Sequence, residues 1–99
     1  QLCHIVSNAF IKSETAQNHY GFSAGSYKDL TRVARLNSAM WTDLMLKNKD
    51  KLSKELGILI ENLQKYQEAI EKNDAVKLNE LLKEGNDLKL QIDVKNGGK

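Results

Sequence analysis

The stretch Leu52–Ile70, LSKELGILIENLQKYQEAI, decides the fold because its apolar residues recur with a helical period. Those residues lie alternately four and three positions apart: Leu52, Leu56, Leu59, Leu63, Tyr66 and Ile70. This alternation makes a seam with a repeat of about 3.5 residues, the pattern that packs long helices side by side. Gly57 lies inside the seam at a cost of roughly 1 kcal/mol relative to alanine. Close contact with another helix explains that glycine better than a break does.

The pattern extends in both directions from this seam. Backward it continues through Met45, Leu44 and Trp41 to Ser38, which predicts one helix of about 35 residues with Asn37 as its N-cap. Forward, Asn73 suits the position after a helix end and Asp74 suits an N-cap, which predicts a tight antiparallel turn. A final helix then folds back, with its inward residues at Val76, Leu78, Leu81, Leu82, Leu88 and Ile92. The domain comprises residues 1–94, and we expect residues 95–99 to be a disordered tail.

The N-terminal part adds shorter helices. Apolar residues at helical spacing from Leu2 to Ile11 predict an amphipathic helix. A loop rich in glycine and serine follows at residues 21–26, and Ser26 or Asp29 caps a short helix that runs to about Leu36. The buried side of this short helix is predicted to be Tyr27, Leu30, Val33 and Ala34. The fold class is therefore all-α, a long antiparallel helical hairpin plus N-terminal helices.

Composition limits the function classes. The chain has 99 residues and 40% hydrophobic content, which gives a modest core, so we expect a homodimer with interlocked helices. Its 15 basic and 13 acidic residues are interspersed, which is not a nucleic-acid footprint. No apolar run reaches the roughly 18 residues of a membrane span. The sequence also lacks a secretory signal pattern and begins at Gln1, in the middle of an apolar helix, so we expect a part of a longer chain.

The single cysteine, Cys3, favours a reducing, cytoplasmic location without an internal disulfide. A metal site built from Cys3, His4 and His19 is not expected, because adjacent ligands on a helix point about 100° apart and no fourth ligand is evident. His19 receives no role.

Residues 21–46, GFSAGSYKDLTRVARLNSAMWTDLML, resemble the C-terminal helical domain of prephenate dehydrogenase. That family has a glycine-rich stretch, an Asp-aliphatic-Thr-Arg-(Ile/Val)-Ala run, and a helix with Met-Trp-x-Asp. The matching positions are Gly21, Gly25, Asp29, Leu30, Thr31, Arg32, Val33, Ala34, Met40, Trp41 and Asp43. The opening LCHIVSNAF is similar to the family helix that reads Ser-His-Leu-Pro-His, with His4 at the second His. The chain departs from the pattern at Gln1 (His in the family), Cys3 (Pro), Leu36 (small and polar) and Asn37-Ser38 (Asp-Pro).

The resemblance implies a fold like the C-terminal domain of 6-phosphogluconate dehydrogenase. It also implies NAD- or NADP-dependent oxidative decarboxylation of prephenate to 4-hydroxyphenylpyruvate in tyrosine biosynthesis. The cofactor and the catalytic base would lie in an N-terminal dinucleotide-binding domain. No strand followed by G-x-G-x-x-G occurs in these residues, and Gly21 and Gly25 have the wrong spacing for a phosphate loop. These residues would supply dimerisation and part of the substrate site, with no catalytic residue of their own, and would be inactive alone.

The resemblance assigns substrate binding to Arg32, His4, Gly25 and Trp41, with Asp29 and Gln1 in support. By the resemblance, Arg32 would pair with a prephenate carboxylate across the dimer interface. Without the resemblance, the spacing suggests an i,i+3 ion pair between Arg32 and Asp29. Asp29 either holds Arg32 or is an N-cap.

Two of the other three substrate residues also have alternative interpretations. His4 is either a pocket or a structural histidine, Gly25 either closes over the substrate or forms a turn, and Trp41 belongs to the core beside the pocket.

Two alternatives remain from the sequence. A stand-alone helical interaction module could use the Leu52–Ile70 seam to bind a partner helix. An arogenate dehydrogenase would differ only in the amino side chain of its substrate.

Overall fold

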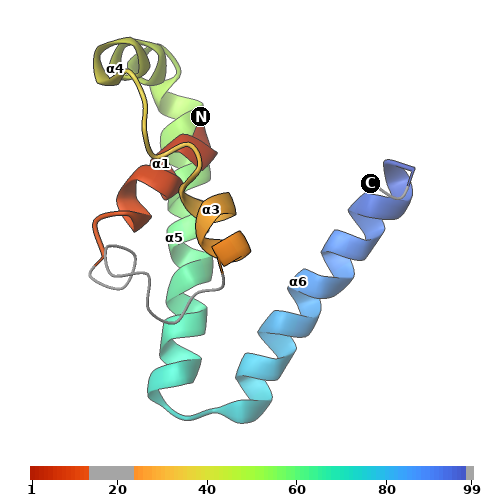
Figure 1. Cartoon of the computed structure of the whole chain (residues 1–99). Coiled ribbons are helices and arrows are strands. Elements are labelled where there is room, and N and C mark those ends of the chain that lie inside the picture. The colour runs from red at the N-terminus through yellow and green to blue at the C-terminus, as the bar shows by residue number, and fades with distance from the viewer. Residues whose placement is uncertain (14–23, 98–99) are drawn as a thin grey trace. The chain divides into compact units, whose positions relative to one another are not determined.

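The computed structural model describes residues 1–13 and 24–97, with residues 24–27 described by their backbone alone. The described part is all-helical, in the order α1 (Leu2–Phe10), α3 (Ala24–Thr31), α4 (Ser38–Lys47), α5 (Lys49–Glu71) and α6 (Ala75–Lys95) (Figure 1). These helices confirm the predicted all-α class. The chain packs as two compact units, Gln1–Leu56 and Gly57–Lys99.

Helix α1 forms where its apolar period predicted it. Gln1 stands before its first turn and accepts a hydrogen bond from the backbone N–H of Ile5 through its carbonyl oxygen at 3.3 Å. The helix ends at Phe10, one residue before the predicted end at Ile11.

Helix α3 differs from the prediction at both ends. It includes Gly25 and Ser26, which were expected in a loop, and it stops at Thr31 rather than near Leu36. Asp29 lies inside α3 and is therefore not an N-cap. After Thr31 the chain makes a tight turn, in which the N–H of Ala34 donates to the carbonyl of Thr31 at 3.0 Å, and the carbonyl of Ala34 accepts a hydrogen bond from the side chain of Asn8 at 2.9 Å.

The predicted buried side of this helix is only partly buried. Leu30 is exposed, whereas Val33 and Ala34, which lie after the helix end, are half-buried. The side chain of Tyr27 and residues 21–23 lie outside what the structure describes, as does His19.

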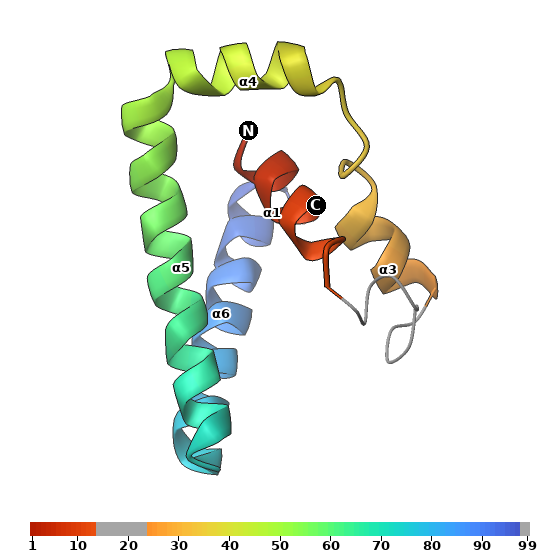
Figure 2. The same ribbon diagram turned by 90° about the vertical axis from the view of Figure 1, so that its left-hand side faces the viewer.

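The long helix predicted from Ser38 onward is wrong, because the chain breaks at Asn48 into α4 and α5. Asn37 caps α4 as predicted, its side-chain oxygen accepting from the N–H of Met40 at 3.0 Å. Asn48 leaves helical geometry at φ −116° and ψ 25°, and its side-chain amide donates to the Gln1 side-chain oxygen at 3.0 Å. Figure 2 shows α4 meeting the first turns of α5 at this corner.

The turn between α5 and α6 confirms the prediction for Asn73 and Asp74. Asn73 adopts φ 53°, and its N–H donates to the carbonyl of Ile70 at 3.1 Å. The N–H of Asp74 donates to Ala69 O at 2.9 Å, which completes a Schellman motif. The Asp74 carboxylate then caps α6 by accepting from the N–H of Lys77 at 2.9 Å.

Helices α5 and α6 touch near this turn and then diverge (Figure 1). Ala69 and Leu81 are the buried apolar residues of the described chain, and the Tyr66 hydroxyl donates to the Leu81 carbonyl oxygen at 3.3 Å. Of the residues predicted to face inward on α6, Leu81 is buried and Leu78 half-buried. The others, Val76, Leu82, Leu88 and Ile92, are exposed, so their predicted burial is wrong for the single chain.

Two further expectations concern α5 and the tail. Within the described residues, a Cβ added at Gly57 would meet no atom of another segment within 4 Å, so the close helix contact expected there is not seen. Helix α6 continues to Lys95, and Asn96 and Gly97 form a hydrogen-bonded turn after it. Residues 98–99 are not described.

Apolar side chains remain exposed along both helices of the hairpin. Leu63 and Ile70 on α5 are 56% and 62% exposed, and Leu82 and Leu90 on α6 are 56% and 55% exposed. In the described part of the chain, two of the six seam residues and several apolar residues of α6 are therefore exposed.

Candidate functional site

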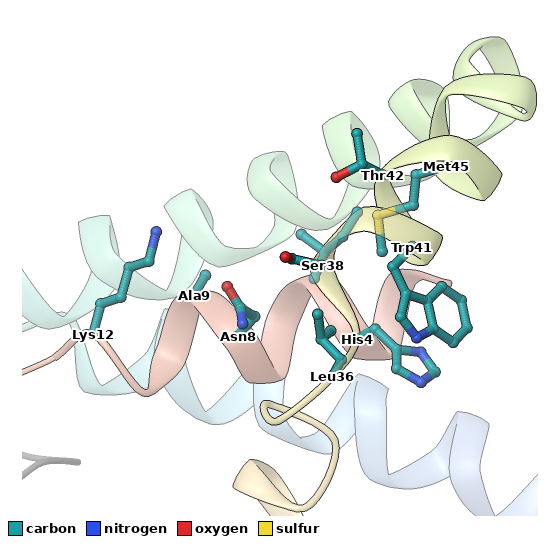
Figure 3. A pocket seen from close by; sticks show the side chains of 10 residues that line it. His4, Asn8, Ala9, Lys12, Leu36, Ser38, Trp41, Thr42 and Met45 are labelled. Carbon is teal, nitrogen blue, oxygen red and sulfur yellow. The ribbon is translucent and has the colours of Figure 1, made fainter.

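A pocket of about 340 Å³ lies in the first unit, between α1 and the segment that leads into α4 (Figure 3). Helix α1 and the turn after it contribute His4, Ile5, Asn8, Ala9 and Lys12. The segment before α4 and α4 itself contribute Leu36, Ser38, Trp41, Thr42 and Met45. The volume lies in the range of small-ligand pockets, about 300–1,000 Å³.

His4 and Trp41 form one end of this pocket. Their rings stack with centroids 4.0 Å apart and an interplanar angle of 28°, and Figure 3 shows the two rings side by side. The Nδ1 atom of His4 is buried, and no atom of the described chain hydrogen-bonds to it. A buried ring nitrogen without a partner can donate to a carboxylate or accept from a hydroxyl. The structure thus brings together two of the predicted substrate residues.

The polar residues of α1 that face the pocket follow its helical repeat. His4 and Asn8 are four residues apart, and Lys12 follows four residues later in the turn after the helix. Residues at this spacing lie on one face of a helix. The pocket therefore has an imidazole near one end, an amide in the middle and an ammonium-bearing chain near the other end (Figure 3).

Arg32 does not line this pocket. It is exposed in the turn that connects α3 to α4, two residues before the Ala34 carbonyl that Asn8 holds. Asp29 is also exposed, and within the described residues no ion pair joins it to Arg32. The i,i+3 ion pair suggested by the sequence is therefore not formed, which leaves the guanidinium open to another anion.

The remaining predicted site residues lie around this unit. Gly25 lies in the first turn of α3. The sequence had placed it in a glycine-rich loop or a simple turn, and the structure shows neither at this residue. Gln1 holds the α4–α5 corner through its hydrogen bond with Asn48. Sequence reasoning missed Asn8 and Asn48, although the four-residue spacing from His4 is a signal for Asn8.

Two classes of site find no support in the described part of the chain. Cys3 is an exposed free thiol, and nowhere do three or more potential metal-ligating side chains come together there. None of its helices combines the length and apolarity needed to cross a bilayer.

Comparison with known proteins places this sequence in a family. The sequence model described as "Prephenate dehydrogenase, dimerization domain" matches residues 1–84. The prephenate dehydrogenase of Bacillus subtilis (strain 168) is 30% identical over 100 residues, which cover 96% of this chain and 27% of that protein. The cyclohexadienyl dehydrogenase of Zymomonas mobilis is 38% identical over 92 residues, which cover 93% of this chain and 31% of that protein. The chain thus spans less than a third of either relative, and no solved structure matches it.

Proposed function

The chain belongs to the prephenate dehydrogenase family through its dimerisation domain, and on that premise we propose that it forms the dimerising, substrate-binding part of a prephenate dehydrogenase. The whole enzyme would oxidise and decarboxylate prephenate to 4-hydroxyphenylpyruvate with NAD or NADP. The observation that carries the proposal is the family match over residues 1–84. The same family match favours an origin of this chain in an enzyme over a stand-alone helical interaction module.

The pocket at His4 and Trp41 is the proposed substrate site within this chain. Prephenate carries a hydroxyl and one carboxylate on a compact apolar ring, and a second carboxylate at the end of its keto-acid side chain. An indole stacked on an imidazole offers a flat apolar wall, and the unpartnered Nδ1 of His4 offers a polar contact beside it. We assign Trp41 to the ring and His4 to a polar group of the substrate.

Arg32 would bind one substrate carboxylate, because its planar guanidinium matches a carboxylate with two parallel hydrogen bonds. Since Arg32 lies outside the pocket of its own chain, we assign it to the substrate held by the partner subunit. Asp29 and Gln1 keep supporting roles, and Gly25 would bring the backbone of α3 close to the substrate.

A homodimer accounts for the exposed apolar faces. The hairpin buries only Ala69 and Leu81 among its described apolar residues, while Leu63, Ile70 and Leu82 remain more than half exposed. Burial of apolar area contributes roughly 25 cal/mol per Å². A second copy whose helices interlock with these faces would supply the stability that the isolated chain lacks.

The nicotinamide cofactor would bind to another part of the enzyme. A dinucleotide site needs a strand, a glycine-rich turn and a helix, and the described residues contain no strand. The described residues therefore do not fit the cofactor, and we assign to this chain dimerisation and the holding of the substrate.

Arogenate is a second candidate substrate. One relative is named for a cyclohexadienyl substrate, and both prephenate and arogenate contain that ring. The two differ in a keto or an amino group on the side chain.

The test is NAD(P)H formation by the whole protein that carries this chain, with prephenate and arogenate supplied separately. We expect turnover of prephenate. Absence of turnover with both compounds would contradict the proposal, and turnover of arogenate alone would reassign the substrate.

A further inference from the structure

One hydrogen bond joins α1 to the turn that carries Arg32. The side-chain Nδ2 of Asn8 donates to the carbonyl oxygen of Ala34 at 2.9 Å, across 26 residues of sequence, and the bond is partly buried. Asn8 lies one helical turn after His4 and lines the same pocket.

Ala34 is also the last residue of a tight turn. Its N–H donates to the carbonyl oxygen of Thr31 at 3.0 Å, which makes Arg32 and Val33 the two central residues. The backbone of central residues in such a turn is set by the hydrogen-bonded residues at its ends. Holding Ala34 therefore fixes where the backbone of Arg32 lies relative to α1.

We propose that Asn8 is a positioning residue for substrate binding, which orients Arg32 by clamping the Thr31–Ala34 turn to the helix that carries His4. The inference rests on the proposed function, in which Arg32 binds a substrate carboxylate. Asn8 acts through Arg32 and not by contact with the reacting atoms. Without its amide, the partly buried carbonyl of Ala34 loses its partner and the turn is free to shift.

This role predicts a specific kinetic result. An interaction that binds substrate and transition state alike raises KM on removal without changing kcat. If Arg32 is displaced from the substrate carboxylate, KM should rise while kcat stays unchanged. A general loss of structure would instead lower kcat and thermal stability as well.

The test uses the whole protein with Asn8→Ala, which removes the amide, and Asn8→Asp, which keeps its shape but cannot donate. The matched control is Asn62→Ala, at an exposed amide on α5. We expect KM for prephenate to rise roughly tenfold in both Asn8 variants, with kcat within about twofold. The control variant should behave as the parent.

A double-mutant comparison separates positioning from structure. In an Arg32→Ala background, Asn8→Ala should lower kcat/KM no further, because the group it positions is gone. An equal fall in both backgrounds would overturn the inference, as would an unchanged KM or a loss of the folded dimer in both Asn8 variants. If the parent turns over neither substrate, the proposed function fails first and this inference fails with it.

Discussion

The rings of His4 and Trp41 stack 4.0 Å apart at one end of the pocket. The two residues come from different helices, and Trp41 is the single tryptophan of the chain. The site therefore contains its own optical probe.

The first prediction uses this probe. Addition of prephenate to the 99-residue chain should change the emission of Trp41, because a ligand in the pocket displaces water from the stacked pair. His4→Ala should raise the emission of the free chain by removing the stacked imidazole, and it should weaken the response to prephenate. Chorismate lacks prephenate's keto-acid side chain and serves as the control ligand. An emission that prephenate leaves unaltered would argue against this pocket.

The second prediction concerns the dimer. Sedimentation equilibrium of the chain at micromolar concentration should give twice 11.2 kDa. Leu63→Glu and Ile70→Glu should each weaken the dimer at least about tenfold, because a charge cannot be buried there without a partner. Glu61→Lys, at a polar exposed position of α5, is the control. A monomer in the unsubstituted chain would remove the proposed role of Arg32 across the interface.

The third prediction compares two glycines inside helices. A Cβ at Gly57 would have open space, and a Cβ at Gly85 would lie 3.8 Å from the Tyr66 hydroxyl, which is ordinary contact. Gly57→Ala and Gly85→Ala should therefore each raise the free energy of unfolding by up to about 1 kcal/mol. Denaturant midpoints measure the effect. If Gly57→Ala lowers the free energy of unfolding while Gly85→Ala does not, a second chain approaches α5 closely at Gly57.

The fourth prediction concerns pH. A hydrogen bond from Lys72 lowers the pKa of Glu68, and one from Lys83 lowers the pKa of Asp87; the same bonds raise the pKa of both lysines. The carboxylates contribute stability that is lost as pH falls through their folded pKa values, and the lysines contribute stability that is lost as pH rises through theirs. Helix content should therefore be greatest between roughly pH 5 and pH 10.

These ion pairs are exposed, so the effect should be small and should shrink in high salt. The measurement is helix ellipticity against pH. The combined variant Glu68→Gln and Lys83→Gln should give a flatter profile, and a profile as steep as that of the parent would contradict the assignment.

Local signals in the sequence predicted several elements. Asn37 and Asp74 cap helices through their own side chains, and Asn73 adopts a left-handed conformation that asparagine tolerates. Each of these features depends on residues within a few positions, so a single sequence is enough to predict it.

Two errors in the predicted helix ends lie where residues far apart in the sequence come into contact. The long helix breaks at Asn48, whose side-chain amide donates to Gln1, and the turn after α3 is joined to α1 by the hydrogen bond from Asn8 to the carbonyl of Ala34. Neither contact is visible in a local pattern. Leu63 and Ile70 follow the predicted apolar period, but both are exposed in the described part of the chain, so the burial expected for the seam is not seen at these two positions.

The pocket was predicted in part. The resemblance selected His4 and Trp41, which the structure brings together, whereas Arg32 lies in a turn outside the pocket lining. In the account proposed above, its placement against a substrate depends on a second chain and on Asn8, and neither is visible in a local sequence pattern.

The most direct measurement is kcat/KM for prephenate of the whole protein, beside its Arg32→Ala and Arg35→Ala variants. Both arginines are exposed and only three residues apart, so Arg35→Ala controls for the loss of a positive charge. The account predicts that Arg32→Ala lowers kcat/KM by roughly a hundredfold or more with fold and dimer intact, while Arg35→Ala changes it little. Equal effects of the two substitutions, or no effect of Arg32→Ala, would contradict a carboxylate-binding role for this domain.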